Sequence, residues 1–131
     1  MTLSAPAWEK LMDEVLTAAG EIDLKPTSGM QSSAKRALDW IKEGKGGGGL
    51  EESTKARARD IAAGKPRTPA QVSQMHRFFS RHASDKKADG WNAGDKSFPS
   101  PGRVAHELWG GDSGKSWSES KFNALKNAGS L

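Results

Sequence analysis

The stretch Leu108–Trp117, "LWGGDSGKSW", decides how the second half of this chain folds, because it sets two adjacent glycines between two tryptophans. Gly110 and Gly111 permit a sharp backbone turn with positive φ where one helix ends. A large aromatic side chain lies on either side of that turn, Trp109 before it and Trp117 after it. We therefore expect two short helices that share one core through these tryptophans.

The residues after the glycine pair predict the start of the last helix. Asp112 or Ser113 has a short polar side chain that can accept a hydrogen bond from a free backbone N–H, so we expect one of them to cap this helix. Apolar residues then recur at helical spacing, and they are Trp117, Phe122, Ala124, Leu125 and Ala128. This pattern predicts a helix with one broad apolar face.

The same stretch contains fragments of two enzyme motifs. A phosphate-binding loop needs a glycine five positions before its Gly-Lys-Ser, and Trp109 occupies that position here. The Gly-Asp-Ser-Gly at 111–114 is typical of trypsin-like proteases, but those enzymes need a β-barrel that positions a base and a carboxylate. No strand pattern is present to build either scaffold, so the sequence favours a turn between helices.

The composition narrows the class of protein. With 131 residues the chain is long enough for a domain with a core of its own. It has no cysteine, which excludes disulfides, thiol redox chemistry and thiolate metal sites. The N-terminal residues lack the basic start and apolar run of a secretory signal, and no apolar run approaches the roughly 20 residues of a membrane span. We therefore expect no membrane partner.

Apolar residues recur at spacings of three and four along most of the chain, and β-branched residues are scarce. The expected helices cover residues 6–19, 28–43, 51–63, 68–83 and 101–109, followed by the last helix after the glycine pair. The sequence thus predicts an all-α fold of about six short helices, with Gly/Pro turns and one long loop that contains aromatic residues.

The clearest helix start is at Thr68. This threonine, Pro69 and Gln71 form a capping box with proline at the first helical position. The residues expected to face inward from this helix are Val72, Met75, Phe79 and Ala83. The loop at 84–99 follows, and we expect its Trp91 and Phe98 to pack into the core and order it.

Four consecutive glycines at 46–49 form the best candidate boundary within the chain, as a flexible hinge or an exposed loop. They divide the chain into an acidic N-terminal helical hairpin at 1–45 and a basic helical module at 50–131. Residues 45–87 carry ten basic and four acidic side chains, so the positive charge is concentrated there. The sequence predicts that a charged partner meets this middle third.

We expect a basic binding face in this region that could contact phosphates or an acidic protein. Its candidate residues are Lys55, Arg57, Arg59, Lys65, Arg67, Arg77, Arg81, Lys86 and Lys87.

The histidines do not fit a metal or catalytic pattern. His76 and His82 are six positions apart on one expected helix, whereas two zinc ligands on a helix are usually three or four apart. His106 is followed by Glu107 but lacks the second histidine of a zinc-protease motif. We expect each histidine at the edge of the core, and we expect no cofactor, no metal and no catalytic residue.

A longer pattern runs from residue 55 to residue 117. It reads ARAR-D, a basic stretch, a helix ending in F-x-R-H, a Gly-Trp loop, and then PS-x-GR-x-A-x-x-LWGG-D-x-G-x-x-W. The matching residues are Ala56–Asp60, Phe79, Arg81, His82, Gly90, Trp91, Pro99, Ser100, Gly102, Arg103, Ala105, Leu108–Asp112, Gly114 and Trp117. This pattern resembles a small module that recurs in tailed-phage proteins, alone or beside head-assembly proteins.

Much of this pattern also has a structural interpretation. We expect its large apolar residues to form the core, namely Phe79, Trp91, Leu108, Trp109 and Trp117. Arg81 and Arg103 could hold loops in place through Asp60 or Asp112 by charge-assisted hydrogen bonds.

The resemblance implies a phage protein located in the virion or the host cytoplasm, and it supplies no catalytic residue. The leading hypothesis is therefore a non-enzymatic structural or accessory protein, associated with the virion or its head, that binds other phage or host proteins. The alternative is a small nucleic-acid-binding or host-directed accessory protein that uses the basic face at 55–87.

Overall fold

The computed structural model describes residues 22–46 and 51–131 of the chain. These residues form helices and no strand, so the all-α prediction is confirmed. The elements are α2 (Ser28–Lys42), α3 (Glu52–Ala62), α4 (Pro69–Arg81), the 3-10 helix η1 (Ala83–Lys87), α5 (Pro101–Leu108) and α6 (Gly111–Asn127). The helix expected at 6–19 lies outside the described residues.

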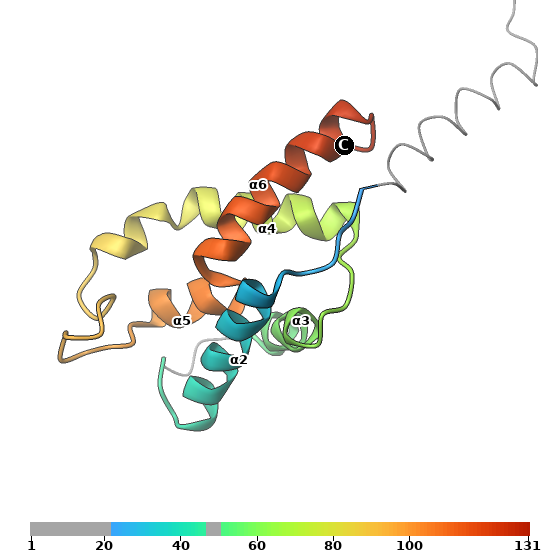
Figure 1. Cartoon of the computed structure of the whole chain (residues 1–131). Coiled ribbons are helices and arrows are strands. Elements are labelled where there is room, and N and C mark those ends of the chain that lie inside the picture. Colours follow the sequence, from blue (N-terminus) through green and yellow to red (C-terminus); the bar gives the residue numbers. More distant parts are fainter. Residues whose placement is uncertain (1–21, 47–50) are drawn as a thin grey trace, which may run out of the picture.

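The helices are arranged in two layers (Figure 1). One layer holds α4 and α6, which pack against each other. In the other layer α2 contacts both α3 and α5, and α6 joins the layers through contacts with α2 and α5. The core lies between the layers. None of the helices in the described ranges is long and apolar enough to span a bilayer.

The start of α4 is the one that the sequence predicted. The Oγ1 atom of Thr68 accepts a hydrogen bond from the Gln71 backbone N–H (3.2 Å), and the Oε1 atom of Gln71 accepts one from the Thr68 N–H (2.9 Å). Pro69 occupies the first turn. The predicted capping box is therefore confirmed.

Changing Thr68 to alanine should lower the free energy of unfolding by about 1 kcal/mol, because an N–H group at the start of α4 loses its acceptor. Urea unfolding followed by circular dichroism measures the loss. Ser32→Ala is the control, because Ser32 is exposed within α2 and caps no helix. We expect Ser32→Ala to change stability by less than about 0.5 kcal/mol. Equal effects of the two changes would contradict a capping role.

The far end of α4 differs from the prediction. The helix ends at Arg81, so Ala83 lies exposed in η1 instead of facing inward. Phe78, which the apolar spacing did not select, is buried. Its ring stacks on Trp109 (centroids 4.8 Å apart) and on His82 (4.5 Å). This stacking on Trp109, at the end of α5, thus accounts for the burial of Phe78.

The large apolar residues of the motif are all buried. Leu108, Trp109, Trp117 and Phe79 belong to one core cluster, which also contains Met30, Ala34 and Ala37 from α2. Trp91 is also buried, but it does not belong to that cluster. The helix before the glycines at 46–49 therefore shares its core with the helices after them. The division of the chain at these glycines stays a prediction, and 47–49 lie outside the described residues.

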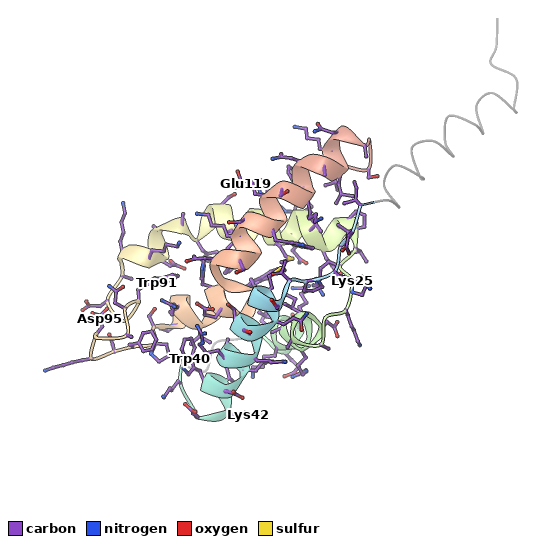
Figure 2. All side chains as sticks on the ribbon, in the orientation of Figure 1. Lys25, Trp40, Lys42, Trp91, Asp95 and Glu119 are labelled. Atoms are coloured by element: carbon purple, nitrogen blue, oxygen red, sulfur yellow. The ribbon has the colours of Figure 1, made fainter. Side chains whose placement is uncertain are left out.

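The loop between η1 and α5 is ordered by a carboxylate. Oδ2 of Asp95 accepts hydrogen bonds from the backbone N–H groups of Gly90 and Asn92, each at 3.1 Å. Trp91 is buried, as predicted, but Phe98 is only half-buried and meets the edge of Trp40 at a centroid distance of 5.4 Å. The expectation that Phe98 joins the core is therefore wrong. Figure 2 shows Trp40, Trp91 and Asp95 at one end of the molecule.

The turn in the opening stretch has the predicted backbone and a different cap. Gly110 and Gly111 have φ values of 109° and 66°, the positive region that glycine tolerates. Gly110 itself is the N-cap of α6, and no side chain caps this helix. The prediction that Asp112 or Ser113 is the cap is wrong, because α6 already begins at Gly111, which places Asp112 in its first turn.

Candidate functional site

The residues of the predicted basic face are distributed over several elements. Lys55, Arg57 and Arg59 belong to α3, whereas Arg77 and Arg81 belong to α4 in the other layer. Arg67, in the link between these two helices, is only 4% exposed. The prediction that Arg67 contributes to an exposed face is therefore wrong.

Several cations of this set are held by neighbouring side chains. Arg59 pairs with Glu52, Lys65 with Asp60 and Lys86 with Asp112. The guanidinium of Arg57 lies 5.8 Å from the centre of the Trp109 ring, within the range of a cation–π contact. Lys87 is exposed in η1.

Of the three remaining cations, Lys55 lies on α3, while Arg77 and Arg81 lie along the outer side of α4. Gln74, His76, Arg77, Ser80 and Arg81 line an open hollow of about 450 Å³, which we call the α4 groove. Arg77 and Arg81 are both exposed and lie four positions apart on α4, so their side chains are neighbours on its surface. In the described part of the chain neither has a carboxylate within 4.0 Å.

A second hollow, of about 160 Å³, adjoins the groove and extends it towards α6. It shares His76 and Ser80 with the groove and adds Lys115 and Glu119. Figure 2 labels Glu119 on α6. Lys115 is not among the predicted residues of the basic face, because it lies far along the chain and is brought near α4 by the packing of α6 on α4.

The polar groups at the base of the groove are already engaged. The His76 ring stacks on Phe122 of α6, with centroids 4.3 Å apart, and the Ser80 hydroxyl donates to the His76 carbonyl (3.0 Å). The guanidinium groups of Arg77 and Arg81 are thus the exposed cationic donors of the groove. This arrangement can attract an anion and offers no paired acid and base.

A polar corner connects η1, α5 and α6. Oδ1 of Asp112 lies 2.9 Å from both Nζ of Lys86 and Nε2 of His106. His106 is buried, and its ring meets the edges of Phe79 and Trp91. Asp112 thus links η1 to α5. Its carboxylate is bound to Lys86 and His106, and this is the physical reason that it does not cap α6 as predicted.

This corner makes stability depend on pH. Burial lowers the pKa of His106, against the opposing effect of Asp112, while the hydrogen bond from Lys86 lowers the pKa of Asp112. In the unfolded chain His106 titrates near pH 6.5 and binds a proton more readily than in the fold. The contribution of His106 to the free energy of unfolding is therefore fully present above about pH 6.5. This contribution is lost as the pH falls towards the lower pKa that His106 has in the folded protein.

Urea unfolding at about pH 7.5, 6.5 and 5.5 measures this loss. We expect His106→Gln to flatten the decrease, because the neutral amide does not titrate. An identical slope in the wild type and in His106→Gln would contradict this assignment.

Arg103 holds the aromatic loop, with partners other than those predicted. Its Nη1 donates to the Trp91 carbonyl (3.0 Å), and its Nε donates to Oε1 of the buried Glu107 (3.0 Å). Neither Asp60 nor Asp112 takes part. The prediction that an arginine pins this loop is correct for Arg103, and its partners are Glu107 and a backbone carbonyl.

The histidines form no metal site in the ranges that the structure describes, where no group of three or more potential ligand side chains comes together. His82 lies at the end of α4, 3.1 Å from Oδ2 of Asp85, and is exposed. It stacks on Phe78, while His76 stacks on Phe122.

Arg67 occupies a second recess at the opposite end of the molecule from Trp91. Its backbone N–H donates to the Leu24 carbonyl (2.8 Å), which fastens residues 22–25 to the link before α4. Its Nε and Nη2 atoms are buried and have no hydrogen-bond partner among the residues that the structure describes. Burial lowers the pKa of Arg67, and Asp60 acts in the opposite direction. Sequence reasoning missed this recess because arginine is usually exposed.

No family model, curated protein or solved structure matches this chain. The similarity to the tailed-phage module therefore stays a prediction that depends on the motif residues.

Proposed function

We propose that the protein is a non-enzymatic accessory protein of a tailed-phage particle, located in or on the head, and that it binds other proteins. The pattern at 55–117 supports the phage origin. Much of that pattern is engaged in the fold: Trp109 and Trp117 lie in the core, and Arg103 holds the aromatic loop. The surfaces that stay exposed then make the contacts with partners.

The observation that carries this proposal is the α4 groove. Enzyme sites usually exclude water and hold reacting groups in a fixed geometry. The α4 groove is instead open to solvent, and its cations lie on the exposed side of a helix. Such a surface suits contact with an acidic patch of another protein, where complementary charge favours encounter and fixes orientation.

Mass spectrometry of purified phage particles tests the proposal. We expect the protein to remain with the particles through a density gradient and a high-salt wash, at a constant ratio to the main head protein. A soluble host protein followed through the same steps is the control for carry-over. Loss of the protein together with that control would contradict a place in the virion.

A second candidate function is binding to nucleic acid through the same groove. It is favoured by the side chains of Arg77, Arg81 and Lys115, which have no carboxylate within 4.0 Å in the described part of the chain. Exposed cations along a groove can neutralise successive phosphates and release bound counterions.

The double change Arg77→Glu with Arg81→Glu separates this function from the first. If the groove binds DNA, affinity should fall at least about tenfold near 0.1 M salt, and the slope of log K against log salt should decrease by about 2. The control is Lys35→Glu with Lys42→Glu, the same change of charge on the exposed side of α2. Equal losses in both pairs would indicate net charge alone, and no loss would contradict DNA binding by this groove.

A further inference from the structure

Arg67 is an unusual arginine because it is buried with unmatched donors. The residue is 4% exposed, and its Nε and Nη2 atoms find no acceptor within residues 22–46 and 51–131. Arginine stays protonated at neutral pH even where burial lowers its pKa. A buried cation with unmatched donors is costly, so the site gains from any acceptor that can reach it.

The side chains around Arg67 form a shallow groove of about 470 Å³. Its walls are largely apolar, with Ile22 and Leu24 from the segment before α2 and Pro66 and Pro69 from the link before α4. Asp23 and Lys25 complete the lining. We call this the Arg67 groove. Lys25, labelled in Figure 2, marks its place at the end of the molecule away from Trp91.

The backbone around Arg67 is fixed before any ligand arrives. The hydrogen bond from the Arg67 N–H to the Leu24 carbonyl joins the two walls, and Pro66 restricts the chain on one side. On the other side the capping box of Thr68 anchors the link to α4. The backbone therefore needs little ordering when a ligand binds, which favours affinity. The buried Nε and Nη2 atoms become accessible when a covering side chain moves aside.

We propose that the Arg67 groove binds a carboxylate carried within an apolar segment of a partner protein. The carboxylate, from an Asp or Glu side chain or a chain end, accepts hydrogen bonds from the guanidinium, whose planar fork matches its two oxygens. Apolar side chains beside it cover Ile22, Leu24 and the two prolines. This inference rests on the proposed function, because it names the partner chemistry for one surface of a protein-binding protein.

The lining favours a carboxylate over a phosphate. A phosphate group that carries two charges is best matched by several cations, as in the α4 groove. Here one buried arginine and Lys25 face an acidic neighbour, Asp23, and the walls between them are apolar. A single negative charge on an apolar segment fits that balance.

The test uses the full chain labelled with nitrogen-15 and three small probes at neutral pH. N-acetyl-leucine has an apolar side chain and a carboxylate, N-acetyl-leucinamide lacks the charge, and inorganic phosphate lacks the apolar group. We expect N-acetyl-leucine to shift the Nε–H signal of Arg67 and the amide signal of Leu24 to saturation, with millimolar affinity. The amide should not saturate these signals, and phosphate should bind at least about tenfold more weakly.

Equal shifts with the acid and the amide would overturn the proposal, and so would tighter binding of phosphate or the absence of a saturating shift. Arg67→Met should abolish the Leu24 shift. If that variant does not fold, Arg67→Lys keeps the charge without the fork and should weaken binding at least about tenfold. Arg77→Met, in the α4 groove, is the control and should bind N-acetyl-leucine like the wild type. The particle experiment is independent: its failure leaves the probe result standing, and failure of the probes leaves a virion location standing.

Discussion

Trp109→Ala is expected to lower the free energy of unfolding by about 3–5 kcal/mol. The side chain is 8% exposed and belongs to the main core cluster. It stacks on Phe78 of the other layer at 4.8 Å, and the Arg57 guanidinium lies 5.8 Å from its ring centre. Removing the indole leaves a cavity between the layers, and this loss is a large part of the roughly 5–15 kcal/mol that holds a typical domain.

Trp40→Ala is the matched control for this prediction. Trp40 is half-buried and meets Phe98 edge-on, outside the fully buried part of the core. Its loss should cost less than half as much as that of Trp109. Urea unfolding should be followed by circular dichroism, because removing a tryptophan changes the fluorescence signal itself. Equal losses would show that the stack between the layers adds nothing beyond the size of the side chain.

Gly111→Ala is expected to cost about 2–4 kcal/mol, from two separate causes. The backbone at Gly111 has φ of 66°, where a Cβ atom is strained. A Cβ atom there would also lie 2.5 Å from Oγ of Ser33 and 2.8 Å from Oε2 of Glu107. Chemical denaturation measures the combined effect.

Gly44→Ala separates these two causes. Gly44 has φ of 81°, but a Cβ atom there would have no neighbouring atom within 4 Å. It should therefore show the backbone strain alone, about 1–2 kcal/mol. If Gly111→Ala is no more destabilising than Gly44→Ala, then the close packing of α6 on α2 and α5 at this turn is not limiting.

Local signals in the sequence were enough to predict most of the helices. The capping box at Thr68 and the glycine pair at 110–111 act over a few residues, and both appear in the structure as predicted. The burial of Trp109 and Trp117 also followed from helical spacing, because large aromatic side chains pay little penalty for leaving water.

The roles of charged residues could not be predicted in the same way. Arg67 is buried because residues 22–25 lie against it, and Asp112 pairs with His106 and Lys86 because three elements meet at one corner. Both results depend on contacts between distant parts of the chain. The residues of the predicted basic face likewise lie on α3 and α4 in different layers, which charge counting along the sequence does not indicate.

The position of α2 in one layer with α3 and α5 has a consequence for how the protein folds during synthesis. α2 can pair early with α3, but its contacts with α5 and α6 join segments about 70–80 residues apart in the chain. At about 5–20 residues per second, the ribosome makes α5 and α6 roughly 4–16 s after α2. During this interval Met30 and Ala34 of α2 lack the core residues of α5 and α6 that cover them in the folded protein. Closing the two layers is therefore a late step, and its contact order is high for an all-helical protein.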